Sequence, residues 1–435
     1  MSTSPLTVGA PRSSMTEFDA PPHAERAQLL NRDFVLLWQA QWVSQLGNQA
    51  FSMATVFWTA ATTHSATLTG VLMAASMVPT VVLAPVGGAL VDRYTRLRIL
   101  ITCDAARGVI AILLALAFVV SPPADRFILV VLATFALGVF SAVFGPALAA
   151  SVPDLVPGRR LEWANAFQQF SRQASGLLGQ GAGGVLFQAL GAPALFLLDG
   201  LSFLFAAASE SWVRLPETPG RRDARVRGGG ILADMREGFV HVCGRPGLLA
   251  FMGLAAVLNL LLTPMAILLP TYVTENLRAD ARWYGFLMAA IGAGSIVGYA
   301  LAGRCSPQGR GRARAVLGLM ASLPLVIALL GLIRQKWIAL AVIFVTGVLS
   351  GAINILVMTT MQRGTRREIR GRVLGLFATV TRVLMPIGMV AGGVVADATR
   401  RNVTLVYSAC GVLAAAAVLV VASQSTTREF LASAS

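Results

Sequence analysis

Charged and metal-binding side chains are scarce in this 435-residue sequence. Only 13% of its residues are charged, against about 25% in an ordinary soluble domain. Its three histidines and four cysteines are scattered, so neither a disulfide framework nor a zinc site is predicted. The motifs GxxxxGK[ST], HExxH and GxSxG are absent, which argues against an ATP-driven pump and the commonest hydrolases. We therefore expect no enzyme activity, no cofactor and no metal.

Apolar residues make up 56% of the chain and gather in long uninterrupted blocks. A helix of about 20 apolar residues crosses the roughly 30 Å hydrocarbon core of a bilayer. The blocks predict an all-α integral membrane protein with twelve transmembrane helices, near 34–59, 68–91, 99–120, 127–150, 161–190, 193–213, 247–274, 283–302, 313–333, 337–361, 371–396 and 403–422.

The predicted spans divide into two sets of six, separated by an arginine-rich polar segment. The N-terminal residues lack a basic head followed by an apolar stretch, so no cleaved signal peptide is predicted. Their Ser-, Thr- and Pro-rich composition favours disorder. The expected organisation is a disordered cytoplasmic tail at 1–30, an N-terminal six-helix half at 31–213, a cytoplasmic linker at 214–246, a C-terminal six-helix half at 247–424 and a second cytoplasmic tail at 425–435.

Basic residues fall mainly on one side of the predicted spans. With the N-terminus inside, 25 of the 35 Lys and Arg residues lie in cytoplasmic segments and seven in external loops. This asymmetry predicts that both termini face the cytoplasm. The net charge of +15 is spread over loops without an aromatic-interleaved basic patch, so no nucleic-acid partner is expected.

An internal repeat links the two halves. The matching pairs, 209 to 211 residues apart, are VGGALVDR (86–93) with VGYALAGR (297–304), GVFS (138–141) with GVLS (347–350), GQGAGGV (179–185) with GMVAGGV (388–394), Asn48 and Ser52 with Asn259 and Thr263, and Arg172 with Arg382. Because each half has an even number of spans, the halves share one orientation. Parallel halves with a site between them near the midplane are the major facilitator architecture.

The first predicted span carries a polar stripe. Its polar residues recur every three or four positions and therefore share one helical face, which must avoid lipid. Two interpretations stay open: interhelical hydrogen bonds worth about 0.6 kcal/mol each, or a binding cavity, which the repeat of the stripe in the second half favours. The candidate substrate-binding residues of the two halves are Gln41, Gln45, Asn48, Ser52, Asn259, Thr263 and Asn354.

Two arginines interrupt predicted spans five and eleven. Arg172 lies roughly 16 Å into its span at 1.5 Å per residue, and Arg382 lies at the equivalent depth. A cation inside a bilayer is costly and is typical of a functional site. We hypothesise that the two arginines contact an anionic or carbonyl-rich group of a substrate, or exchange partners during a conformational cycle. The alternative is a structural ion pair with Asp199.

Carboxylates inside the predicted spans are few. Asp104 and Arg107 stand three residues apart on one helical face and are expected to pair. A buried carboxylate suits proton coupling because it can titrate as its access to water alternates. Asp104 and Asp199 are the candidates, neither lies on the first span, and a purely structural ion pair remains the alternative for Asp104.

The segment GALVDRYTRLR at 88–98 follows the second predicted span. It is similar to the G-x-L-x-D-R-x-G-R-R/K motif of Major Facilitator Superfamily transporters, with Thr95 where the family usually has glycine. The resemblance implies a cytoplasmic hinge that locks the halves in one access state through charge pairs. Its residues are Gly88, Asp92, Arg93 and Arg96.

Two further segments, at 152–167 and 195–209, resemble the superfamily's drug and siderophore exporter branch, which includes macrolide and enterobactin exporters. The likeness extends from about residue 30 to residue 425. In span five, GQGAGG has Gln180 where the family's antiporter signature, GPxxGG, has proline. The arginine motif that many drug antiporters carry in span four is missing.

The resemblance implies a secondary active transporter that exports a small hydrophobic or amphiphilic molecule, such as an antibiotic or siderophore, by proton antiport with alternating access. The expected partners are a small-molecule substrate, the proton gradient and the lipid bilayer. We expect a monomer in the bacterial cytoplasmic membrane. The alternatives are uptake or lipid transport by the same fold, and a non-transporting membrane accessory protein.

Overall fold

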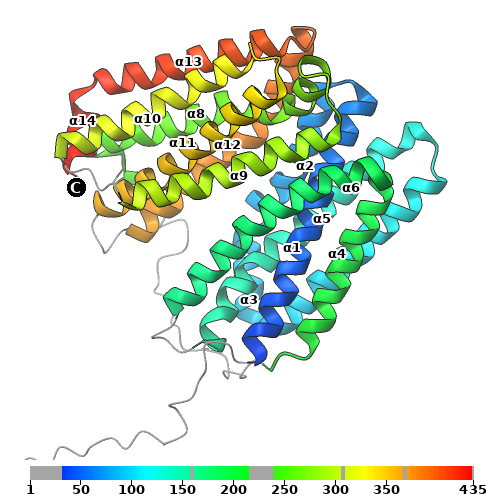
Figure 1. Ribbon diagram of the computed structural model, residues 1–435. Coiled ribbons are helices and arrows are strands. Elements are labelled where there is room, and N and C mark those ends of the chain that lie inside the picture. The colour runs from blue at the N-terminus through cyan, green and yellow to red at the C-terminus, as the bar shows by residue number, and fades with distance from the viewer. Residues whose placement is uncertain are drawn as a thin grey trace, which may run out of the picture.

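The computed structural model describes residues 32–156, 161–214, 239–240, 242–304, 309–365 and 370–433. Within these ranges the regular structure is helical, without strands. The helices form two bundles, one from α1 to α6 and one from α8 to α14 (Figure 1). The predicted N-terminal tail at 1–30 and most of the predicted linker at 214–246 lie outside the described residues.

Helices run nearly the whole length of both bundles. The first contains α1 (Arg32–Thr63), α2 (Ala66–Val82), α3 (Ala84–Arg93), α4 (Arg96–Val120), α5 (Pro123–Leu155) and α6 (Leu161–Ser211). The second contains α8 (Pro246–Thr271), a π-helical turn (Tyr272–Asn276), α9 (Ala281–Arg304), α10 (Gly309–Leu330), α11 (Lys336–Arg363), α12 (Arg370–Ala398), α13 (Val403–Ser423) and α14 (Ser425–Ser433).

All twelve predicted spans coincide with helical segments, with one difference in continuity: the second span is divided between α2 and α3. Within α6 the backbone leaves the helical conformation at Gly191 (φ 76°, ψ 177°), just before Pro193, so α6 consists of two helical stretches that correspond to the fifth and sixth predicted spans. In the described part of the chain, nine helices are long and apolar enough to cross a membrane by length and composition, and α1 is not among them. Its polar stripe lowers its hydropathy. The all-α membrane fold is confirmed, and the count of twelve stays a prediction.

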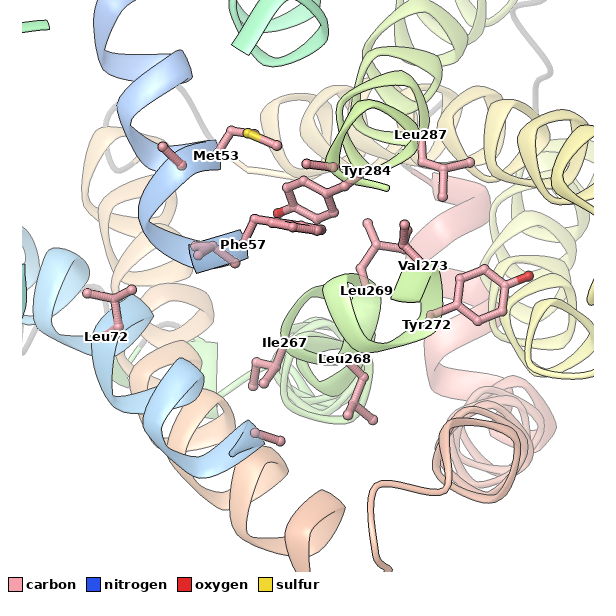
Figure 2. Close-up of a cluster of buried hydrophobic side chains, with 14 of the residues drawn as sticks. Met53, Phe57, Leu72, Ile267, Leu268, Leu269, Tyr272, Val273, Tyr284 and Leu287 are labelled. Atoms are coloured by element: carbon pink, nitrogen blue, oxygen red, sulfur yellow. The ribbon is translucent and has the colours of Figure 1, made fainter. Parts of the chain in front are cut away.

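The buried apolar side chains show where the bundles meet. We call the end where α1 starts and α6 stops the linker end, and the opposite end, where α2 starts and α12 stops, the far end. At the far end one cluster draws on both bundles, including Phe57, Leu72, Leu269, Tyr284 and Met389. Figure 2 shows Phe57 beside Tyr284 across this junction, with ring centroids 5.7 Å apart.

At the linker end the buried clusters are separate. One, including Phe34, Leu100 and Val152, belongs to the first bundle. The other, including Leu248, Val316 and Leu431, belongs to the second, where the segment predicted as a tail packs against α8 as the helix α14. Among the described residues, the buried apolar cluster that combines both bundles therefore lies at the far end, and the contact of α6 with α9 continues from there to Leu177 and Gly292.

The repeated glycine pairs explain how closely the bundles approach. Gly183 packs against Ala50 of α1, and its repeat mate Gly392 packs against Pro264 of α8. The second glycine of each pair faces the other bundle. A Cβ at Gly184 would lie 2.8 Å from the carbonyl oxygen of Ala281, and one at Gly393 would lie 2.5 Å from that of Ala66. Only glycine permits this backbone contact.

Candidate functional site

The polar stripe of α1 divides between two environments. Gln41 is buried, and its Nε2 donates a 2.9 Å hydrogen bond to Oε1 of Glu210 on α6. Asn48 and Ser52 lie further along α1 with exposed side chains. The hydrogen-bond interpretation of the stripe thus holds at Gln41, and the cavity interpretation stays a prediction for the exposed stretch.

A small pocket opens beside the linker-end part of the stripe. It is lined by Trp38, Gln41, Gln45, Leu148, Gln168, Ser171 and Arg172. Trp38 is fixed by a 2.7 Å hydrogen bond from its Nε1 to Ser171 Oγ and by Phe167, 4.9 Å away between ring centroids. The buried Oε1 of Gln45 accepts no hydrogen bond from the described residues. A guanidinium, three carboxamides and an indole suit a ligand with an acidic or carbonyl group and an apolar body.

The structure does not bring Arg382 into this pocket. Arg382 is exposed on α12, seven residues before Met389 and eleven before Gly393, so it shares the α12 face that contacts α2 at the far end. The two glycine repeats are 209 residues apart and the two arginines 210. One residue turns a helix by about 100°, which places Arg172 and Arg382 on non-equivalent faces.

The candidate residues of the second bundle are dispersed. On α8, Asn259 Nδ2 donates to the Ala255 carbonyl at 2.9 Å, and the buried Thr263 hydroxyl donates to the Asn259 carbonyl at 2.5 Å. These local bonds satisfy the side chains within their own helix. Asn354 is exposed on α11. None of the three lines the pocket beside α1.

The predicted hinge lies at the turn between α3 and α4. Arg96 pairs with Asp154 at the end of α5 and donates a 2.8 Å hydrogen bond to the Ala150 carbonyl. Space is open around Gly88, and Arg93 is exposed. Asp92 lies in α3, but its side chain falls outside the described part of the structure. The pair between Arg96 and Asp154 therefore lies within the first bundle.

Asp104 and Arg107, both on α4, form the predicted ion pair. The guanidinium lies 4.0 Å from the ring centroid of Phe144 and 4.6 Å from that of Phe203. Asp199 is fully buried near this pair, and no cation among the described residues forms a salt bridge with its carboxylate, which lies beside the Ser202 hydroxyl. The alternative of an ion pair between Arg172 and Asp199 is therefore not seen.

Glu210 is a buried acid that the sequence reasoning missed. It is 0% exposed and accepts the hydrogen bond from Gln41. A signal was present, because Asp199 and Glu210 are eleven residues apart and so occupy one face of a helix. Glu210 lies only three residues from the end of its predicted span, where a carboxylate is easily read as part of the adjoining loop.

A second unpredicted contact joins the bundles at the far end. The carboxylate of Asp397, on α12, accepts hydrogen bonds from the Ser65 hydroxyl at 2.7 Å and from the backbone nitrogens of Ala66 and Thr67 at 2.8 and 2.9 Å. A carboxylate at a helix N-terminus satisfies free N–H groups and complements the helix dipole. Asp397 thus caps α2 from the opposite bundle.

Known exporters resemble this chain over most of its length. Macrolide efflux protein A of Streptococcus pyogenes is 23% identical over 369 residues, covering 84% of this chain and 89% of the relative. The multidrug efflux pump Tap of Mycolicibacterium fortuitum is 27% identical over 341 residues, covering 76% and 81%. The enterobactin exporter EntS of Escherichia coli is 27% identical over 320 residues, covering 72% and 71%.

Solved transporters share the fold. A bacterial homologue of the iron transporter ferroportin, in an inward-facing state, superposes with a TM-score of 0.69 at 16% identity, covering 91% of this chain and 100% of that one. A bacterial homologue of the lysosomal transporter Spinster, inward-facing and unoccupied, gives 0.66 at 14% identity, covering 92% and 97%. The sequence profile of the Major Facilitator Superfamily matches residues 37–389. With its two helical bundles and its exporter relatives, the chain belongs to the Major Facilitator Superfamily.

Proposed function

We propose that this transporter exports a small hydrophobic or amphiphilic molecule from the bacterial cytoplasm, by proton antiport with alternating access. The observation that carries the proposal is the one-ended junction of the bundles: they share a buried core at the far end and have separate cores at the linker end. With the linker in the cytoplasm, as the distribution of arginines favours, this is a state open to the inside. The names of the relatives support export as the direction.

The pocket beside α1 is the proposed contact for the polar end of the substrate. Arg172 supplies a cation and Gln41, Gln45 and Gln168 supply hydrogen bonds. The exposed Asn48, Ser52, Arg382 and Asn354 would line the remainder of the path as the bundles rock about the far-end junction. We further propose that Arg96 and the α3–α4 turn engage the other bundle only when the linker end closes, since their described pair now lies within one bundle.

The test is accumulation of a panel of macrolides, dyes and siderophores in an efflux-deficient bacterial host. Cells expressing the protein should hold less of at least one compound, and a protonophore should abolish the difference. Higher accumulation than in empty-vector cells would instead establish uptake. No difference across the panel, with the protein shown to be folded in the membrane, would reject export of these compound classes.

Replacing Arg172 with glutamine should reduce export of any compound with an acidic or carbonyl group about ten- to a hundredfold. The reason is the loss of a charge-assisted hydrogen bond, worth about 1.5–3 kcal/mol. The measurement is initial efflux rate against substrate concentration. Arg126→Gln is the control, because Arg126 lies at the start of α5 and bonds the Ser121 carbonyl outside the pocket. Equal rates for Arg172→Gln and the wild type would remove Arg172 from the site.

A further inference from the structure

The interior of the first bundle holds more negative than positive ionisable groups. Asp104, Asp199 and Glu210 are each 0% exposed, and Arg107 is 8% exposed. We call these four side chains the buried acid row. One guanidinium can balance only one of the three carboxylates, so two acids lie in the bundle without a counter-cation among the described residues.

The row has a definite order along α6. Asp199 and Glu210 share one face of this helix and are separated by about 16 Å along its axis at 1.5 Å per residue. The Asp104–Arg107 pair of α4 lies between them and interacts electrostatically with both. The guanidinium is held in place by the rings of Phe144 and Phe203.

The described residues of the surrounding helices supply no second cation near the acids. From α1 the row meets Gln41, at Glu210, and the backbone of Gly47, near Asp199. From α5 it meets the Phe144 ring, and the remaining titratable neighbour is the Cys103 thiol of α4. Among the described residues, no group donates a hydrogen bond of normal geometry to either oxygen of Asp199 or to Oε2 of Glu210. The neutral Ser202 hydroxyl lies beside the Asp199 carboxylate and donates a 2.7 Å hydrogen bond to the Asp199 backbone carbonyl. An isolated carboxylate in such surroundings costs several kcal/mol as an anion and becomes neutral by binding a proton.

We propose that Asp199 and Glu210 are the proton-binding sites of this transporter and that Gln41 connects the second of them to the substrate pocket. Gln41 lines the pocket on one side and donates to Glu210 on the other. When the Glu210 carboxyl releases its proton to water at the linker end, the resulting carboxylate binds the Gln41 amide more strongly. This orders Gln41 at the wall of the pocket for substrate binding, so proton release and substrate binding favour each other at the linker end, as antiport requires. The coupling step rests on the proposed function. The protonation of Asp199 and Glu210 does not depend on it.

The protonation of Asp199 and Glu210 can be measured without any substrate. Infrared spectra of the purified full-length protein in liposomes should contain the carbonyl-stretch band of protonated carboxyl groups at neutral pH. Asp199→Asn and Glu210→Gln should each remove part of this band. Glu275→Gln, which removes an exposed glutamate paired with Arg401, should leave it intact. Absence of the band at neutral pH, or a band that both row substitutions leave unchanged, would overturn the proposal.

The connection to the pocket is tested in proteoliposomes with a compound that the accumulation panel identifies. Glu210→Gln mimics the protonated state, so it should retain exchange of that compound across the membrane and lose acceleration by a pH gradient. Full gradient-driven transport by this variant would overturn the coupling role even if the infrared band is present. If no panel compound is transported, the infrared result still decides whether the two acids hold protons.

Discussion

Replacing Arg107 with methionine is expected to destabilise the protein by about 3–5 kcal/mol, the usual effect of removing one partner from a buried ion pair. Asp104 would be left fully buried without the cation that pairs with it, and the rings of Phe144 and Phe203 would lose the guanidinium that they contact. The measurement is the denaturation midpoint of the purified protein in detergent. Arg282→Met is the control, because its pair with Asp280 is largely exposed and worth about 0–1 kcal/mol.

A double substitution separates the ion pair from the rest of the buried acid row. Asp104→Leu combined with Arg107→Met removes both charges, so much of the stability lost in the single variant should return. This recovery is expected only if Asp199 and Glu210 are protonated, because neutral carboxyl groups do not need the guanidinium as a counter-cation. A double variant no more stable than Arg107→Met would indicate that these acids are ionised in the folded protein.

The membrane fold followed from the sequence because the bilayer imposes a simple rule on it. Each spanning helix must be apolar for about 20 residues, and every segment that this pattern predicted as a span is helical where the structure describes it. It also separated the fifth and sixth spans between residues 190 and 193, where Gly191 leaves the helical conformation with a φ of 76°. The charge pair on α4 was predictable from a spacing of three residues.

The candidate site was less predictable because its geometry depends on partners distant in sequence. The spacing of the α1 stripe predicted one polar face, but it could not show that α6 packs so that Gln41 bonds Glu210 and Gln45 lines the pocket. The repeat likewise paired Arg172 with Arg382, and a register difference of one residue places them on different faces. Asp397 was missed because no local pattern shows that its carboxylate caps a helix of the other bundle.

Substituting alanine for Gly393 is expected to open the far end of the transporter. The added Cβ would lie 2.5 Å from the Ala66 carbonyl oxygen and 2.7 Å from the Thr67 Cα, both backbone atoms of the other bundle. No side-chain rotation relieves that contact, so α12 and α2 must separate, which also weakens the cap by Asp397. Overpacking of this kind costs about 1–3 kcal/mol, enough to shift a two-state equilibrium about 5- to 150-fold.

The shift can be measured as a distance between spin labels on Ala61→Cys and Ala398→Cys in a cysteine-free background, since both residues are exposed at the far end of opposite bundles. Gly393→Ala should add a longer distance. Gly375→Ala is the matched control, because it places the same methyl group on the same helix where space is open. Gly184→Ala should act like Gly393→Ala, because its Cβ meets the backbone of Ala281 across the bundles. A distance unchanged by both interface substitutions, or changed equally by Gly375→Ala, would show that the repeated glycines do not hold the far end closed.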